Sequence, residues 1–283
     1  MTNPIRRSVL TSGQSVGDGW PEMMESVDYA ALVTRDGDRV TATGRLVRDH
    51  TGDWFEPPLF RLLSVDMARE VRPAWRGAIR ITGANFDDLS NRRERDGAVE
   101  GFAALTGIWS ASQLRVETQA PPEPDPPYVG WRTPPCPAPE GGWLRLTWGR
   151  GDKNLAYDLG DLRETGAAVA VTQFRPSEDQ AVLVVAAADV DAVEAQLRPQ
   201  LGQLLCVIAS TWTTDELEAV RAHLHAHHEE WNLYQWGPDV TSQGQPQITA
   251  RLTRVLPPIA VWADTLPAGI LDLRPWLRRA QLA

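Results

Sequence analysis

Hydrophobic and polar positions alternate along much of the N-terminal part of the chain, and this period of two residues predicts strands. In residues 114–118 the side chains of Leu114, Val116 and Thr118 alternate with polar ones, which is typical of a half-buried strand. Further apolar runs predict strands at residues 29–33, 40–46, 59–63, 78–83 and 99–109. Asp36-Gly37 lies between the first two runs and predicts a tight hairpin turn.

Glycines interrupt these predicted strands and favour a curved sheet. Gly44, Gly101 and Gly107 fall inside the runs, where a glycine typically marks a bulge or a sharp bend. About five or six short strands with such bends predict a small β-barrel, OB-like or SH3-like. A β-sandwich is the alternative that the same pattern allows.

The C-terminal part of the chain mixes the strand period with the helix period. Helices are predicted to begin at Asp189, Thr213 and Pro258, where capping residues or proline precede an apolar stripe. Strands are predicted at residues 167–174, 181–187, 204–209, 248–255 and 269–273. This order of elements predicts an α+β sandwich of the split βαβ type.

A proline-rich stretch, residues 121–142, separates the two patterns. It holds nine prolines, and proline removes a backbone donor and fixes φ, which excludes a helix or a central strand. No internal repeat is visible. We therefore expect four segments, which are a flexible arm (1–25), a β-barrel domain (26–120), a proline-rich linker (121–142) and an α+β domain (143–283).

Composition is typical of a globular protein. The 283 residues, 42% hydrophobic and 23% charged, suffice for a buried core and argue against global disorder. No apolar run is long enough to span a membrane, and the N-terminus lacks the apolar region of a secretory signal. Of 28 basic residues only Lys153 is a lysine, a bias that GC-rich bacterial codons favour. We expect a bacterial, cytoplasmic protein.

The two cysteines are interpreted in the same way. Cys206 lies in the apolar run LLCVIA, which predicts a small buried hydrophobic side chain, and Cys136 lies in the proline-rich stretch. Two cysteines make a poor disulfide framework. We therefore expect both to be reduced thiols.

The formal charge of −9 is unevenly distributed. Residues 28–119 carry 13 arginines and 14 acidic residues, whereas residues 151–283 carry 10 basic and 17 acidic residues. The acidic C-terminal part repels a phosphate backbone, so an anionic ligand is expected to prefer the N-terminal part.

The strongest basic cluster of the N-terminal part is Arg92, Arg93 and Arg95, in a predicted loop between two strands. The aromatic residues that can offer stacking surfaces beside it are Trp54, Phe55 and Trp75. One hypothesis is therefore a barrel that binds single-stranded nucleic acid. The competing interpretation is a solvated loop with core tryptophans, since acidic neighbours neutralise part of the cluster and the overall charge is acidic.

Four of the five histidines lie within six residues of the second predicted helix, which is expected to continue to Tyr234 and to stop at Gly237-Pro238. His223 and His227 are one turn apart, as two metal ligands on a helix should be. The His-Glu-x-x-His pattern fails because Asn232 stands where the second histidine is needed. A metal-dependent hydrolase is thus one alternative, and a helix with packed or solvent-facing histidines is the other.

Two further motifs have local explanations. Gly13-Gln-Ser-Val-Gly17 matches the nucleophile elbow, but it opens the chain and lacks the strand and helix that the elbow requires. Trp276, near the C-terminus, either anchors a partner or docks on the protein's own core.

The sequence therefore favours a non-enzymatic binding or assembly protein that contacts another protein and needs no cofactor. It shows no complete catalytic constellation, although active sites also assemble from residues far apart in sequence. Nucleic-acid binding and metal-dependent hydrolysis are the two alternatives.

Overall fold

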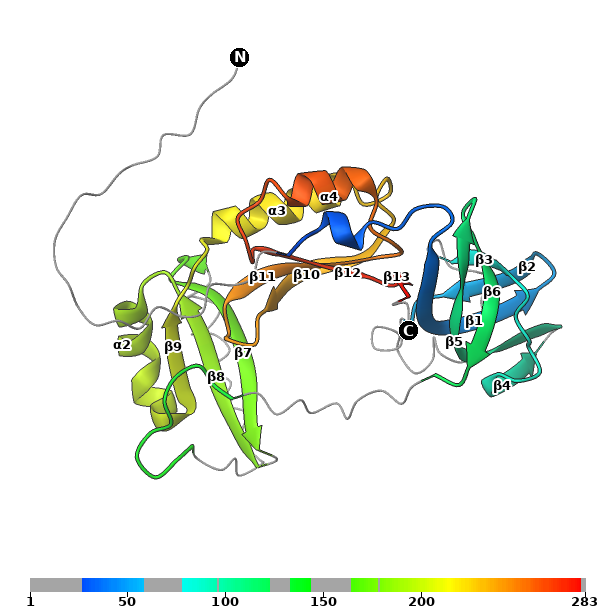
Figure 1. Ribbon diagram of the computed structural model, residues 1–283. Helices are drawn as coiled ribbons and strands as arrows, with labels where there is room; N and C mark the ends of the chain where they lie inside the picture. The colour runs from blue at the N-terminus through cyan, green and yellow to red at the C-terminus, as the bar shows by residue number, and fades with distance from the viewer. Residues whose placement is uncertain are drawn as a thin grey trace, which may run out of the picture.

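The computed structural model describes residues 27–58, 78–95, 97–122, 133–143, 164–177 and 179–280. These residues form an α+β protein in which strands predominate (Figure 1). A three-stranded sheet lies in the middle, with the N-terminal sheet on one side and a second three-stranded sheet on the other. In the described part of the chain, no helix has the length and apolar character to cross a membrane.

Six strands build most of the N-terminal sheet: β1 (Arg39–Asp49), β2 (Gly52–Glu56), β3 (Ile79–Thr82), β4 (Ser90–Arg95), β5 (Ala98–Ser110) and β6 (Gln113–Ala120). Neighbouring strands run β1-β2-β3-β6-β5, and β5 also pairs with β1, so the hydrogen bonding returns to its start. The contact of β3 with β6 is parallel, and the other contacts are antiparallel. Leu46, Phe55 and Leu114 lie fully buried in the core that these strands share.

The bulge expected at a glycine is confirmed at Gly107, and all three glycines lie where a neighbouring segment comes close. A Cβ at Gly44 would overlap the carbonyl oxygen of Glu56, and one at Gly107 would overlap that of Arg115. The β5–β6 register shifts between Thr106 and Gly107, which is the signature of a bulge. A Cβ at Gly101 would lie 2.6 Å from the Cβ of Leu89. Only glycine permits these close approaches of neighbouring backbones.

The predicted hairpin of residues 29–33 with residues 40–46 is wrong. Residues Ala30–Leu32 form a short 3₁₀ helix, η1, in which Asp28 accepts a hydrogen bond from the Ala31 amide. Tyr29 and Val33 lie four residues apart, so one helical turn presents both to the same core. Apolar residues at this spacing also suit a strand, which is why the pattern misleads.

One C-terminal unit, the β9 unit, contains β7 (Ala168–Ser177), β8 (Gln180–Ala187), α2 (Val190–Leu201), the 3₁₀ turn η3 (Gly202–Leu204) and β9 (Leu205–Ala209). The strands β7 and β8 are antiparallel, and α2 then crosses over to β9, which is parallel to β8. The predicted cap is confirmed, because the Asp189 side chain accepts a hydrogen bond from the Ala192 amide. Val193 and Leu197 bury the inner side of α2 against the sheet.

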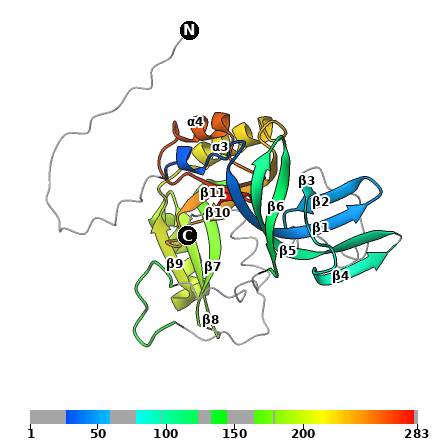
Figure 2. The ribbon, with the colours of Figure 1, turned by 45° about the vertical axis from the view of Figure 1, so that its right-hand side comes forward.

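The other C-terminal unit, the β12 unit, repeats this order with β10 (Leu233–Val240), β11 (Pro246–Leu252), α4 (Pro257–Ala263) and β12 (Leu271–Pro275). Its strands again form an antiparallel hairpin followed by a parallel third strand. The preceding helix α3 (Thr214–Ala226) lies with α4 on one face of this sheet, as the turned view in Figure 2 also shows. The C-terminal strands thus divide between two small sheets of one topology.

The predicted end of the second helix is wrong. The capping box of Thr213 and Glu216 starts α3 as expected, but the helix stops at Ala226. Asn232 then adopts a left-handed conformation with φ 53°, which reverses the chain into β10. Strand β10 accommodates Pro238 because it lies at the edge of its sheet, where a missing amide hydrogen costs no ladder bond.

Each end of the described chain packs into a core that the other part of the chain builds. Trp276 packs on Phe55 with 4.6 Å between ring centroids, its Nε1 donates to the Thr43 carbonyl, and the short strand β13 (Arg278–Arg279) pairs with β1. In the opposite direction, Tyr29 donates a 2.6 Å hydrogen bond to the Leu271 carbonyl of the β12 unit. Each end therefore completes a core built mainly by the other part of the chain.

Candidate binding surfaces

The C-terminal end of α3 gathers aromatic and histidine rings from three elements. His223 stacks on Trp262 of α4 with 4.4 Å between centroids and 19° between planes. His227 stacks on Trp231 at 4.7 Å, and 4.6 Å separate the rings of His223 and His227. Sequence reasoning found the histidine pair but missed Trp262, which lies 39 residues after His223 in sequence.

The other two histidines of this cluster face a different partner. His225 and His228 stack nearly parallel at 5.5 Å, and Trp236 of β10 lies 5.3 Å from His228. The histidine cluster is therefore split between two aromatic groups on different sides of the helix end. This division follows from the helix period, since residues two apart point in different directions.

The histidine pair, for which metal binding was one alternative and packing the other, is engaged in packing. His227 Nδ1 lies 3.0 Å from the Glu230 carboxylate, and both rings lie against tryptophans. Among the residues that the structure describes, no group of three or more His, Cys, Asp or Glu side chains is placed to hold a metal ion. Partial burial, and then the charge of His227, lower the pKa of His223 and favour its neutral form.

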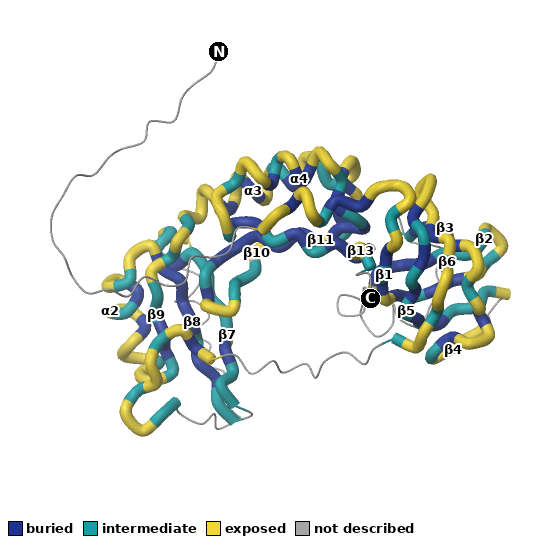
Figure 3. Tube along the Cα trace, in the orientation of Figure 1, coloured by how far each residue is buried: buried dark blue, intermediate teal, exposed yellow. Residues whose placement is uncertain are grey.

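An exposed apolar residue precedes Trp262 in sequence, and the helix that carries His223 is acidic. Val261 is 68% exposed, and Trp262 beside it is half-buried. Residues 213–230 carry five acidic side chains and a single arginine, Arg221, which already bonds Glu218 at 2.7 Å. Figure 3 shows exposed positions along the outer sides of α3 and α4. We call His223, His227, Val261 and Trp262, with their carboxylate neighbours, the helix-layer surface.

The arginine cluster lies on a strand, so the predicted loop at residues 91–96 is wrong. Strand β4 pairs with one edge of β5, beside the first residues of that strand. Arg92 bonds Glu94 at 3.1 Å, and Arg93 stands opposite Glu100 in the register. Arg95 ends the strand and is placed by its backbone pairing with Ala98. Carboxylates thus accompany the two arginines whose side chains are described.

The residues predicted to stack on bases differ in their exposure to solvent. Phe55 has no exposed surface and belongs to the N-terminal core, so it cannot offer a face to a base. Trp276 is 7% exposed and docks on the same core, which favours the self-docked alternative over a partner anchor. Trp75 lies outside the described residues. Trp54 alone is half-exposed on the outside of the sheet.

Trp54 is paired with an arginine that sequence reasoning missed. The Arg80 guanidinium lies 3.9 Å from the centre of the Trp54 ring, in a cation–π contact. Thr51 holds both partners, because its carbonyl accepts from Arg80 and its hydroxyl accepts from Trp54 Nε1. The register pairs Trp54 with Arg80 across β2 and β3, and the strand pattern alone does not give that register.

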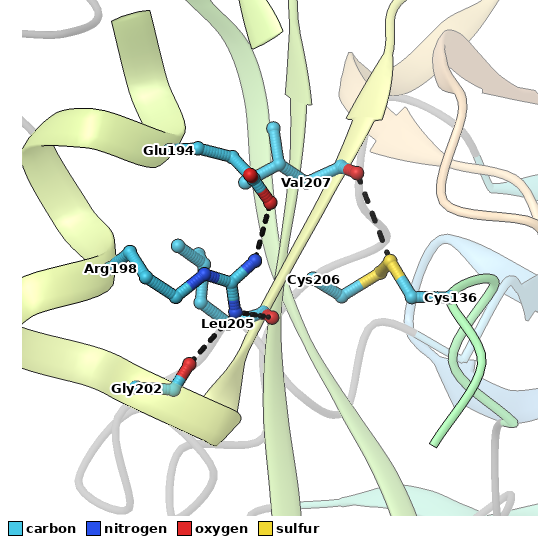
Figure 4. Close-up of a disulfide and its surroundings, with 7 residues drawn as sticks. All are labelled: Cys136, Glu194, Arg198, Gly202, Leu205, Cys206 and Val207. Carbon is cyan, nitrogen blue, oxygen red and sulfur yellow. Dashed lines mark hydrogen bonds and ion pairs between the residues drawn. A yellow bond between two sulfur atoms is a disulfide. The ribbon is translucent and has the colours of Figure 1, made fainter. Parts of the chain in front are cut away.

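Both cysteines form one disulfide, so the expectation of reduced thiols is wrong. Cys136, in the proline-rich segment, joins Cys206 of β9 across 70 residues, with 5.7 Å between the Cα atoms (Figure 4). Cys206 is buried as expected, with 1% exposure. Gln180 Nε2 donates to the Trp143 carbonyl and holds the end of residues 133–143 near the same sheet.

A cavity of about 530 Å³ opens beside this disulfide. Arg198 and Glu194 of α2 line it and bond each other, while the Arg198 guanidinium also donates to the carbonyls of Gly202 and Leu205. The remaining lining residues are mostly apolar and come from both sides of β9: Cys136, Pro137, Pro139, Trp143, Gly202, Gln203 and Leu205. Cys136 is thus one wall of the cavity and is only half-buried.

Comparison with known proteins found no similar protein. No family model matches the chain, and neither a curated protein nor a solved structure matches it. The function must therefore be argued from the geometry of these surfaces.

Proposed function

We propose that the protein is a non-enzymatic binding or assembly protein of the bacterial cytoplasm, which contacts another protein through the helix-layer surface. One observation carries this proposal. Trp262 and His223 form a stacked, partly exposed pair, and Trp262 follows in sequence Val261, the most exposed large hydrophobic side chain of the described residues. Aromatic anchors within a polar rim are the usual composition of protein interfaces.

The charge of this surface favours a basic partner. The carboxylates of residues 213–230 outnumber the single arginine there, and that arginine already has a carboxylate partner. A partner that presents arginine or lysine around an apolar side chain would complement both features. Stacking on Trp262 would supply contact area, and the rim charges would speed association.

We further infer that the N-terminal unit is a small OB-like barrel and forms the first of two domains. The hydrogen-bonded ring β1-β2-β3-β6-β5 and the apolar core inside it support a barrel of five strands. The glycine approaches at Gly44 and Gly107 give the sheet the bends that such closure requires.

The test of the partner surface uses a fluorescein-labelled, arginine-rich peptide with central leucine and tryptophan anchors. Fluorescence anisotropy of the full chain at low salt should show binding that weakens as salt rises. Val261→Ser removes the exposed apolar contact without adding a charge and should weaken binding about tenfold, which corresponds to ~1.4 kcal/mol.

Val27→Ser is the matched control, because Val27 is the other exposed large hydrophobic residue, at 52% exposure. Both variants lose one exposed apolar side chain and change no charge, so they separate the helix-layer surface from a general loss of apolar surface. Absence of binding at low salt, or equal weakening by both variants, would overturn the proposal.

A second candidate function is single-stranded nucleic-acid binding, which the exposed pair of Trp54 and Arg80 favours. An aromatic ring and a guanidinium on the outside of a barrel form a stacking platform for bases. Titration with an oligothymidylate at two salt concentrations tests it, with Arg80→Ala against Arg115→Ala as the control. Binding at low salt that only Arg80→Ala abolishes would support this candidate, and no binding would remove it. No observation among the described residues favours the metal-dependent hydrolase.

A further inference from the structure

The disulfide lies at the edge strand of the β9 unit. Strand β9 is the last strand of its sheet, and the sequence from Leu205 to Ala209 carries no charge and no proline. Every second carbonyl of a strand points to the same edge. An apolar edge strand with free backbone groups is a template for pairing with another chain, and proteins usually block it.

Three different groups occupy the outer edge of β9. Arg198 donates to the Leu205 carbonyl at 2.9 Å, and Gln245 Nε2 donates to the Ala209 carbonyl at 3.0 Å. Between them, the Val207 carbonyl lies 3.8 Å from Cys136 Sγ (Figure 4). A disulfide sulfur has no proton to donate, so the middle of the edge is covered by the bond but not satisfied by it.

The same segment also covers an apolar face. Phe174, Val182 and Val184 form the face of the sheet that lies opposite α2, and Cys136 and Trp143 pack against it. Within the described residues, the Gln180–Trp143 contact is the only hydrogen bond from residues 133–143 to this sheet. Four prolines in the segment remove further donors. The covalent bond is therefore the main tether of the cover.

We propose that the Cys136–Cys206 bond is a thiol–disulfide exchange site, at which a dithiol reductant releases residues 133–143 from β9 and from the apolar face beside it. Cys136 is half-buried and lines the cavity, whereas Cys206 is buried, so an attacking thiolate is expected to approach Cys136 Sγ. In a reducing cytoplasm, the location proposed above, disulfides are usually transient or redox-sensing.

The exchange conserves electrons and protons. A thiolate of the dithiol attacks Cys136 Sγ, the bond between Cys136 and Cys206 breaks, and Cys206 leaves with the electron pair and takes a proton from water. The second thiol of the reductant, as its thiolate, attacks the reductant's own sulfur in the mixed disulfide and expels Cys136, which is then protonated. The protein gains two electrons and two protons, and the dithiol becomes a cyclic disulfide.

The experiment treats the oxidised full chain with dithiothreitol in native buffer and quenches samples with N-ethylmaleimide for mass spectrometry. Two thiols should become reactive while circular dichroism stays unchanged. Hydrogen exchange should then rise at least about tenfold in β9, with β5 and β12 unchanged. Reduction that requires a denaturant, or reduction without a local rise in exchange, would show a static staple and overturn the proposal.

Variants provide an independent arm. Cys136→Ser should show the exchange pattern of the reduced protein without any reductant, whereas Pro137→Ala, in the same segment, should keep the pattern of the oxidised protein. Should Cys136→Ser fail to fold, the reduced wild type still decides the matter. This arm measures only the β9 unit. A negative result would therefore overturn the exchange proposal without contradicting partner binding at the helix-layer surface.

Discussion

The β9 unit and the β12 unit share one topology but differ in the chemistry of their second sheet face. Each has a hairpin, a crossover helix and a parallel third strand, and each buries one face under helices. In the β9 unit the opposite face is apolar, with Phe174 and Val182, and residues 133–143 cover it together with Val240 of β10. In the β12 unit the opposite face carries Thr249, Asp239 and Arg274.

This difference shows that strand order alone does not decide what a sheet needs around it. A polar face forms its own bonds, since Arg274 bridges Asp272 and Asp239, and Thr249 donates to Asp239. An apolar face must be covered, and here the cover comes from a segment with few hydrogen bonds, so a covalent bond holds it. Four changes test the contrast between the units.

The largest effect is expected from Trp276→Ala, which breaks the tie of the β12 unit to the N-terminal sheet. The substitution empties a core site against Phe55 and should cost about 3–5 kcal/mol of unfolding free energy, measured with urea. Hydrogen exchange should accelerate in β1 and β12 but not in β8. Equal acceleration in β8 would mean that the two units do not respond separately.

Removal of the disulfide should affect the β9 unit next most strongly. A Cys136→Ala/Cys206→Ala variant removes the cross-link between residues 70 positions apart and so raises the entropy of the unfolded chain. Its free energy of unfolding in urea should fall by about 2–4 kcal/mol. Chemical reduction of the wild type is the matched comparison. A loss much larger than that on reduction would place the cost in side-chain packing instead of the cross-link.

The polar face of the β12 unit should prove more tolerant. Arg274→Met leaves Asp239 and Asp272 without their shared cation, but all three are partly exposed, so a loss of about 0.5–1 kcal/mol is expected. Added salt should reduce this loss. Arg251→Met, on the same face and without a carboxylate partner among the described residues, should change the urea midpoint little.

The smallest effect is a pH dependence confined to the β12 unit. The lowered pKa of His223 means that the unfolded chain binds a proton more readily than the folded one. Stability from this group is therefore complete above the usual histidine pKa and declines as pH falls through it towards the folded value. Urea midpoints at about pH 7.5 and about pH 5.5 should differ less in His223→Gln than in wild type. An identical difference in both would exclude His223 as the cause.

Local signals carried the successful part of the sequence interpretation. The caps at Asp189 and Thr213 bond residues three positions further along, so a short stretch of sequence contains both partners. The strands β5 and β6 and their glycine bends are likewise evident from short patterns. Helix and strand periods could not be told apart at Tyr29–Val33, nor beyond Ala226, where the backbone of Asn232 reverses the chain.

What the sequence could not reveal are the long-range pairings. The partner of Cys136 lies 70 residues away, Trp276 inserts beside Phe55, and His223 stacks on Trp262. Each contact depends on the relative placement of whole elements. The candidate histidines were found by their spacing, but the surface that they form needed the neighbouring helix.

The packing of each chain end into the other part of the chain has a consequence for how the protein can be divided. A fragment ending before residue 121 retains Tyr29 and Val33 without their pocket, and it lacks Trp276 and Leu277 from its own interior. The complementary fragment has the reverse defects. Each half therefore leaves a gap in its core that side chains of the other half fill. We expect two fragments made by a cut in the proline-rich segment to be more stable together than apart.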